Sequence, residues 1–204
     1  MKKIGPFWKS ECNTFISNNI VGKQILDIGC GAYPHPKATL TLDAIEEVRI
    51  RDRVFRPDVV ADINEHIPLP DNYVDCIIMN NVLEHVHNPK NTLAECRRVL
   101  KRGGVLLVTV PFLVKIHQEP IDYHRYTIYM LELLFKDFQY KITPSKHNLT
   151  YLYTITQNSL FGMIGKKKHP VGFVISRIIK ILTLFLPEVS EESYPYGYLV
   201  SGRK

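Results

Sequence analysis

Residues 25–36 read Ile25-Leu26-Asp27-Ile28-Gly29-Cys30-Gly31-Ala32-Tyr33-Pro34-His35-Pro36, and this stretch decides the fold. Its first four residues are typical of a short buried strand, which ends at Gly29. Gly29 and Gly31 carry no Cβ, so the backbone there can approach a ligand closely. A dinucleotide loop would have a third glycine at position 34, where this chain has proline, and then a full helix. Only seven residues separate Gly31 from Thr39, so the loop suits a nucleoside without phosphates.

The rest of the chain alternates short apolar runs with helical patterns, which is typical of an α/β protein. We expect one clear helix that begins at Pro89, with Asn88 as its cap, and ends near Gly103. A second helix should run from Thr127 to Phe135. The other expected elements are a first helix near 9–20 and strands at 25–28, 39–43, 59–61, 74–79, 105–110, 138–143 and 198–203.

The composition is that of a soluble globular chain of 204 residues, long enough for one domain with a sizeable core. The net charge of +6 fits an acidic partner, such as an anionic substrate, a membrane surface or nucleic acid, and equally fits solubility alone. The four cysteines form no C-x-x-C pair, which indicates a reducing compartment and no zinc site. The first residues lack the apolar core of a secretory signal, so we expect a cytoplasmic protein.

Acidic residues stand at or near the ends of the first three expected strands. Asp27 lies in the first strand, Asp43 ends the second and Asp62 follows the third. Ligands of open α/β sheets bind at the carboxyl ends of the strands. Asp43 can accept both hydroxyls of a ribose, Asp62 can accept from the amine of an adenine, and Asp27 can receive an ammonium group. Helix capping is the structural alternative for Asp43 and Asp62.

Several motifs follow one another in the order found in one enzyme family. They are ILDIGCG, TLD and VVADINEHIPLPDNYVDCIIMNNVLEHVHNPKNTLAECRRVLKRGGVLLVTVPF. Over about 20–143 and 198–203 the sequence resembles the class I S-adenosylmethionine-dependent methyltransferases, in particular a methyltransferase-11-like subgroup. The resemblance implies a Rossmann-like, doubly wound sheet of seven strands flanked by helices. Such a sheet is mostly parallel with an antiparallel last strand, and here a helical insertion would precede that strand.

The resemblance also implies the cofactor, S-adenosylmethionine, with S-adenosylhomocysteine as its product, and the residues that hold it. Those around the methionine moiety are Asp27, Gly29, Cys30 and Gly31. Those around the nucleoside are Asp43 and Ala44 at the ribose and Asp62 and Ile63 at the adenine, with Asn80 beside the methionine portion or the sulfonium.

Titratable groups gather after the strand at 105–110, where the acceptor of a methyl group would bind. Methyl transfer is an in-line displacement, and a base near a hydroxyl acceptor helps to remove its proton. His117 or His124 could be that base. Asp122 could orient a histidine, and Arg125 could bind an anionic acceptor. The structural alternative is that these residues knit the loop and cap the next helix.

This run also resembles the H-x-x-P-x-D-Y-x-R-Y-T segment of a methyltransferase subgroup associated with cell-surface glycan and related small-molecule pathways. Some methyltransferases of similar pattern hold a divalent metal with Glu-x-x-Glu-His. Here Asn81 stands at the first of these positions, so we expect no metal site. Glu84 and His85 are then interpreted as the structural start of a helix.

We expect a single methyltransferase domain over 1–204, with a core at about 20–143 and 196–204 and a helical insertion or lid at about 145–190. Within that insertion, Lys166-Lys167-Lys168 precedes an amphipathic apolar helix at about 171–186. An ordinary helix packed on the sheet is one interpretation. The other is a peripheral element that docks on an anionic membrane at its inner face and receives a lipid-linked acceptor.

The sequence thus predicts transfer of a methyl group to oxygen or nitrogen of a small-molecule or glycan acceptor. The alternatives are a non-catalytic protein that binds S-adenosylmethionine and a membrane-associated enzyme with a lipid-linked acceptor. A nucleic-acid acceptor is disfavoured because the chain has no base-flipping motif and its basic residues are dispersed. A nicotinamide oxidoreductase is disfavoured by Pro34 and the missing crossover helix. No obligate protein partner is expected.

Overall fold

The computed structural model describes residues 6–50, 52–145, 178 and 195–204. The chain divides into two compact units, Met1–Thr143 with Gly197–Lys204 and Pro144–Tyr196. The predicted insertion at 145–190, with its lysine run and apolar helix, lies almost wholly outside the described residues. Among the described residues, no helix has the length and apolar character needed to cross a membrane.

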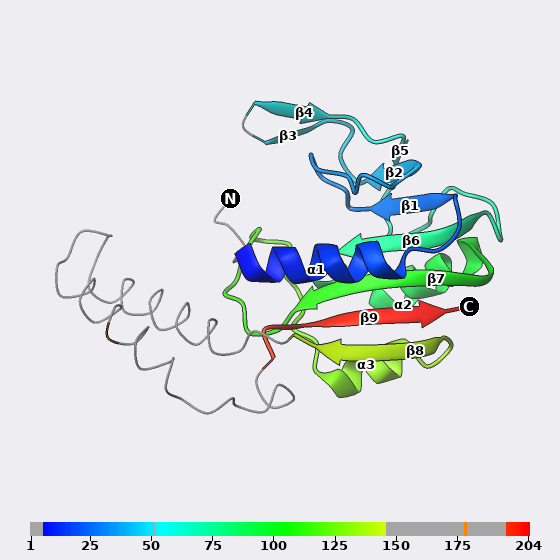
Figure 1. The fold of residues 1–204 in the computed structure, drawn as a ribbon. Coiled ribbons are helices and arrows are strands. Elements are labelled where there is room, and N and C mark those ends of the chain that lie inside the picture. Colours follow the sequence, from blue (N-terminus) through cyan, green and yellow to red (C-terminus); the bar gives the residue numbers. More distant parts are fainter. Residues whose placement is uncertain (1–5, 51, 146–177, 179–194) are drawn as a thin grey trace. The chain divides into compact units, whose positions relative to one another are not determined.

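The first unit is built on one seven-stranded sheet with helices on both faces (Figure 1). In chain order, the first strand pairs in parallel with both the second and the sixth. The sixth strand also pairs in parallel with the seventh. The last strand runs antiparallel to the seventh. The predicted Rossmann-like fold is therefore confirmed. In spatial order the strands are β5 (Val59–Val60), β2 (Leu40–Asp43), β1 (Ile25–Ile28), β6 (Val74–Asn80), β7 (Leu100–Pro111), β9 (Gly197–Arg203) and β8 (Gln139–Pro144).

The topological switch point lies between β1 and β6. From β1 the chain moves outward to β2 and β5, and it then returns to the other side of β1 to form β6 and β7. Ile28 pairs with Met79, so the carboxyl ends of β1 and β6 lie side by side. Asn80, the last residue of β6, therefore stands next to the loop that begins at Gly29, where ligands of this fold class bind.

The helices cover opposite faces of the sheet. Figure 1 shows α1 (Pro6–Asn19) on one face, with α2 (Pro89–Val99) and α3 (Ile128–Leu134) on the other. Successive side chains of a strand point to opposite faces. Cys76 and Ile78 accordingly pack in one buried cluster and Met79 in the other.

The caps of α2 and α3 are as predicted. Asn88 Oδ1 accepts a hydrogen bond from the backbone N–H of Asn91 at 3.4 Å, and Thr127 Oγ1 accepts one from Met130 at 3.3 Å. Each bond satisfies one of the backbone donors that the first turn of a helix leaves without an intrahelical acceptor.

Three elements differ from the sequence-based expectation. The prediction that α2 ends near Gly103 is wrong: Leu100 is already extended and begins β7, and Gly103 lies within that strand with φ of 78°. An unexpected antiparallel hairpin is formed by β3 (Val48–Ile50) and β4 (Arg53–Phe55). The Glu84-His85 pair lies in η1 (Leu83–His85), a single 3-10 turn.

Candidate functional site

The glycine loop after β1 is tied directly to the carboxylate that ends β2. Gly29 has φ of 64° and Gly31 has φ of 55°, values that glycine adopts without strain. The N–H of Gly29 donates to the carbonyl of Leu42 at 2.8 Å, and the N–H of Gly31 donates to Asp43 Oδ2 at 2.9 Å. A Cβ on Gly29 would lie 2.5 Å from Val82, whereas one on Gly31 would point into open space. The loop thus presents bare backbone beside a carboxylate.

Asp27 is a buried carboxyl group at the same edge of the sheet. Its residue is 4% exposed, and Oδ2 accepts the backbone N–H of His35 at 2.7 Å. Burial raises the pKa of Asp27 to about 6, the bond from His35 lowers it in part, and the charge of Asp43 adds to the rise. Because burial disfavours its charged form, this group would gain from a cation placed against it.

The segment after the glycines lies between α1 and β4. The ring of Tyr33 has Lys9 Nζ 5.7 Å and Arg53 Cζ 4.8 Å from its centroid. His35 Nε2 lies 3.4 Å from the hydroxyl of Ser17. No helix forms between Gly29 and β2, as the short link predicts. The hairpin of β3 and β4 therefore borders the glycine loop, a contact that the sequence did not reveal.

The predicted adenine residues lie on the loop that follows β5. Asp62 is exposed, and its Oδ1 accepts from the backbone and side chain of Asn64 at 2.9 and 2.8 Å. Ile63 is buried, and its carbonyl accepts from Thr92 Oγ1 at 2.8 Å. Ala44 is exposed directly after Asp43.

Arg98 of α2 anchors the later part of this loop, at Ile67 and Leu69. It forms a double hydrogen bond with Glu95, with both distances 2.8 Å, and it donates to the carbonyls of Ile67 and Leu69 at 2.8 and 2.9 Å. Hydrogen bonds from Arg98 hold the pKa of Glu95 at about 2 against the opposing effect of burial. The two residues thus position the loop that carries Asp62.

Cys30 lies in the glycine loop, but its thiol lacks the environment of a reactive nucleophile. The residue is 8% exposed, and its thiol is free. Burial raises its pKa to about 12, and the negative charges of Asp27 and Asp43 add to the rise. The thiol therefore stays protonated, and what the loop offers a ligand is backbone.

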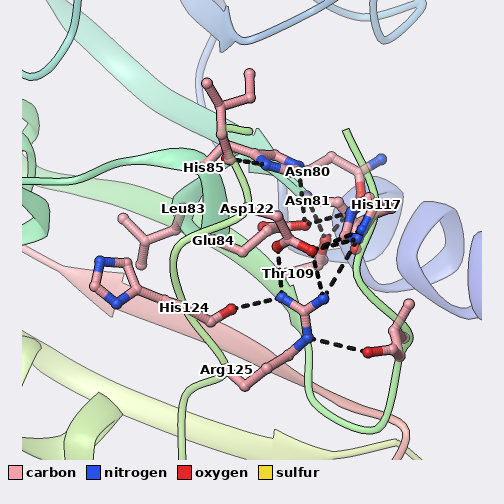
Figure 2. A network of polar contacts seen from close by, with 12 residues as sticks. Asn80, Asn81, Leu83, Glu84, His85, Thr109, His117, Asp122, His124 and Arg125 are labelled. Carbon is pink, nitrogen blue, oxygen red and sulfur yellow. Dashed lines mark hydrogen bonds and ion pairs between the residues drawn. The ribbon is translucent and has the colours of Figure 1, made fainter. Parts of the chain in front are cut away.

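At the end of β6, two asparagines are held by Thr109 of the neighbouring strand β7. Asn80 Oδ1 accepts from Thr109 Oγ1 at 2.7 Å and from Asn81 Nδ2 at 2.9 Å. Asn81 has φ of 56°, and its N–H donates to the Thr109 carbonyl at 3.0 Å. Trp8 Nε1 of α1 donates to Asn81 Oδ1 at 2.9 Å. Figure 2 shows Asn80, Asn81 and Thr109 in the same view as His117. Asn80 is thereby fixed at the switch point.

The loop between β7 and α3 brings together three of the four predicted catalytic residues. Arg125 binds both oxygens of Asp122, with Nη1–Oδ1 at 2.6 Å and Nη2–Oδ2 at 2.7 Å, and His117 Nδ1 lies 3.2 Å from Asp122 Oδ2 (Figure 2). Burial tends to raise the pKa of Asp122, but hydrogen bonds from Arg125 and the His117 N–H outweigh it and hold the pKa at about 2. Arg125 is thus committed to Asp122, as the structural alternative predicts.

Glu84 of η1 lies at the centre of this network. Its side chain is fully buried, and Oε1 is 3.7 Å from Nε2 of both His85 and His117. The Glu84 carbonyl accepts the N–H groups of Tyr123 and His124 at 3.0 and 3.1 Å, which holds the loop against η1. The contact with Glu84 raises the pKa of His117 despite partial burial.

The imidazole of the fourth predicted residue, His124, does not join this network, although the His124 carbonyl accepts a hydrogen bond from Arg125 Nη1 at 2.8 Å. Its ring is directed away from His117 in Figure 2 and lies 5.2 Å from the ring of Tyr126, centroid to centroid. The sequence missed Thr109 and did not assign Glu84 and His85 to the site. One sequence feature could have pointed to Glu84 and His85. This Glu-His pair follows within five residues of Asn80, the end of a strand already assigned to the site.

Comparison with known proteins agrees with this geometry. Residues 26–108 match the model of a family described as a methyltransferase domain. The chain is 30% identical over 105 residues to a probable S-adenosylmethionine-dependent methyltransferase of Mycolicibacterium smegmatis, covering 47% of this chain and 41% of the relative. It is 37% identical over 119 residues to an uncharacterized protein of Methanocaldococcus jannaschii, covering 55% and 58%. The chain thus spans about half the length of these curated relatives.

A solved structure extends the likeness of fold to nearly the whole chain. The crystal structure of an S-adenosylmethionine-dependent methyltransferase from Archaeoglobus fulgidus superposes with a TM-score of 0.59 at 18% identity, covering 96% of this chain and 92% of that one. The glycine loop, the strand-end carboxylates and the matched family model agree with this fold. Over residues 26–108 the chain thus matches the methyltransferase-domain family, and its fold is that of the class I S-adenosylmethionine-dependent methyltransferases.

Proposed function

We propose that this chain transfers the methyl group of S-adenosylmethionine to an oxygen or nitrogen of a small-molecule or glycan acceptor. The hydrogen bond between the N–H of Gly31 and Asp43 Oδ2 carries the proposal. It uses one oxygen of Asp43 to fix the glycine loop and leaves the second for a ligand's hydroxyls. A ligand held this way would have its ribose at the end of β2 and its remainder against the bare loop.

The residues at this edge fit the cofactor. S-adenosylmethionine supplies a methyl group on a positively charged sulfur and carries an ammonium group. Asp27 would face that positive charge, which offsets the burial that raises its pKa to about 6. Gly31 offers open space where a side chain would stand, and Gly29 and Cys30 complete the loop.

The rest of the cofactor site follows from the loops after β2, β5 and β6. We assign Asp43 and Ala44 to the ribose and Asp62 with Ile63 to the adenine. Asn80 would lie beside the methionine portion, because it ends the strand next to β1. The cradle is completed by the anchored loop that carries Asp62.

The acceptor would bind on the side of η1 and the loop that carries His117. An attacking hydroxyl or amine must lose a proton, and the neutral imidazole of His117, oriented by the carboxylate of Asp122, is a base within this loop that can accept it. Burial raises the pKa of the Cys12 thiol, hydrogen bonding to Thr109 and Asn81 opposes that rise, and the charge of Glu84 adds to it, so these groups share one neighbourhood. We therefore propose His117 and Asp122 for proton handling, with Arg125 holding Asp122. His124 has no proposed role.

Two experiments test this function. Calorimetry should show 1:1 binding of S-adenosylmethionine, and incubation with a panel of hydroxyl and amine acceptors should release S-adenosylhomocysteine with at least one of them. Binding without turnover on any acceptor would favour the non-catalytic alternative. Absence of binding would overturn the proposal. The membrane-associated alternative, with its peripheral docking at a membrane, stays a prediction because its residues lie outside those described.

A further inference from the structure

Glu84, His85 and His117 form a cluster, here called the Glu84 cluster, that has the geometry of a metal-ion site. One ligand atom from each residue can be chosen so that all three lie within 4.8 Å of one another. Glu84 Oε1 is 3.7 Å from each histidine Nε2, too far for a hydrogen bond. Bonds of about 2.1 Å at tetrahedral angles place neighbouring zinc ligands about 3.4 Å apart. Small movements of the imidazole rings would reach that spacing.

The buried carboxyl group of Glu84, when ionised, would be stabilised by a positive charge placed against it. The residue is 0% exposed, and within the described part of the chain neither carboxylate oxygen has a hydrogen-bond partner. An ionised carboxylate removed from water without partners is strongly destabilising. The guanidinium of Arg125, drawn in Figure 2, has both of its terminal nitrogens bound to Asp122. A cation bound between Glu84 and the two imidazoles would supply this positive charge.

The outer nitrogens of both imidazoles are already committed, so the inner ones can serve as ligands. His85 Nδ1 lies 2.7 Å from the carbonyl of Ile121, which can only accept, so Nδ1 carries the proton. His117 Nδ1 lies 3.2 Å from Oδ2 of Asp122, a carboxylate that Arg125 keeps ionised, and 3.5 Å from Arg125 Nη2. The shorter contact, to the carboxylate, places the proton on Nδ1. In the neutral rings both Nε2 atoms then carry the lone pair. Metal-binding histidines show this pattern, with the second nitrogen donating to a carbonyl or carboxylate.

We propose that the Glu84 cluster binds one divalent transition-metal ion, with Zn²⁺ as the first candidate. Two imidazoles and one carboxylate suit zinc and its neighbours in the first row, whereas Mg²⁺ and Ca²⁺ prefer oxygen ligands. Three protein ligands leave at least one position open. This inference departs from the sequence-based expectation of no metal, which rested on Asn81. Here the third ligand comes from His117, 32 residues further along the chain.

The role of the ion rests on the proposed function. An acceptor hydroxyl bound at the open position would lose its proton at lower pH, because the ion stabilises the oxyanion. That oxygen would attack the methyl carbon: the new O–C bond forms as the S–C bond breaks, and sulfur keeps the electron pair as a neutral thioether. The proton leaves to solvent. With the ion bound, His117 Nε2 is a ligand and no longer a base.

Metal binding can be tested without cofactor or acceptor. Untagged protein is stripped with EDTA, dialysed and titrated with Zn²⁺ by calorimetry, and Co²⁺ is followed by its visible absorption. We expect one ion per chain and a higher melting temperature with the ion. Glu84→Gln, His85→Gln and His117→Gln should each weaken binding more than about 100-fold. Asp122→Asn, which keeps all three ligands but alters the group that holds His117 Nδ1 and Arg125, should weaken it about 10-fold.

His87→Gln is the matched control, because His87 is exposed and only two residues from His85. It should bind Zn²⁺ like the natural protein, and S-adenosylmethionine binding should confirm that each variant is folded. The proposal is overturned if the stripped protein binds no Zn²⁺, as expected if protonated His117 alone balances Glu84. Equal binding by Glu84→Gln and the natural protein, which would place the ion elsewhere, also overturns it. Zinc binding without methyl transfer would leave the site intact and remove only its proposed role.

Discussion

Asp27→Asn should stabilise the cofactor-free protein near pH 8 and weaken its binding of S-adenosylmethionine. The carboxyl group is 4% exposed, and burial moves its pKa from 3.8 to about 6. At about 1.4 kcal/mol for each pKa unit, the folded state disfavours the ionised carboxylate by about 3 kcal/mol. The amide keeps an acceptor for the N–H of His35 but adds donors that need partners, so we expect a net gain of about 1–2 kcal/mol.

The sign of the pH dependence follows from proton binding. Between the unfolded pKa of 3.8 and the folded pKa of about 6, the folded state holds the Asp27 proton more tightly than the unfolded state. The contribution of Asp27 to the free energy of unfolding therefore falls as pH rises through this window and stays low above it. The Asn variant lacks this dependence. Its advantage should be present near pH 8 and vanish near pH 4.

Urea unfolding of both proteins at the two pH values measures the difference, and calorimetry near pH 8 measures the affinity for S-adenosylmethionine. We expect weaker binding by the variant, because the cofactor's positive charge loses its counter-charge. If Asp27→Asn is destabilising by the same amount at both pH values, the reasoning about burial is refuted. If its affinity for the cofactor is unchanged, Asp27 does not face the methionine moiety.

Two further changes test the supports of the site, and a third tests an ion-paired carboxylate at the other end of β6. Gly31→Ala should cost only about 1 kcal/mol of stability, because its Cβ would meet open space at a φ of 55°, yet it should reduce cofactor affinity in calorimetry much more. Arg98→Lys should lower the free energy of unfolding in urea by about 1–3 kcal/mol, because lysine cannot make both hydrogen bonds to Glu95 and those to the two loop carbonyls. An unchanged free energy would contradict the role of Arg98 in anchoring the loop. Asp75→Asn should destabilise the protein near pH 7. Hydrogen bonds from Lys101, Gln24 and Lys23 hold the Asp75 pKa at about 2, so the difference in unfolding free energy should shrink as pH falls from 4 towards 2. A pH-independent difference would contradict this.

The sheet could be predicted because its strands are buried on both faces. Ile25–Ile28 and Val74–Asn80 are near-continuous apolar runs that end at polar or glycine residues, a pattern that depends little on distant contacts. The end of α2 could not be predicted in the same way. Gly103 suits the end of a helix, but Leu100 pairs with Val74 and takes the chain into the sheet earlier. A tertiary contact overrode a local preference.

In the candidate site, too, contacts between nearby segments could be predicted and contacts between distant segments could not. Asp43 and the glycine loop are close in sequence, and their hydrogen bond follows from adjacent parallel strands. The Glu84 cluster joins η1 to a loop 32 residues away, and only the folded backbone shows that His117 faces Glu84. His124 shows the converse. It lies in the same run as His117, but its ring points away from the network.

Calorimetry of S-adenosylmethionine binding to the natural protein and to Asp43→Ala tests the central claim most directly. Asp43 is proposed to accept two ribose hydroxyls, and it also fixes Gly31 through a 2.9 Å bond. Hydrogen bonds to a charged group contribute about 1.5–3 kcal/mol each, so the variant should bind at least about 100-fold more weakly. Glu46→Ala, which removes an exposed carboxylate from the same segment, should bind normally. Equal affinity of Asp43→Ala and the natural protein would contradict the account.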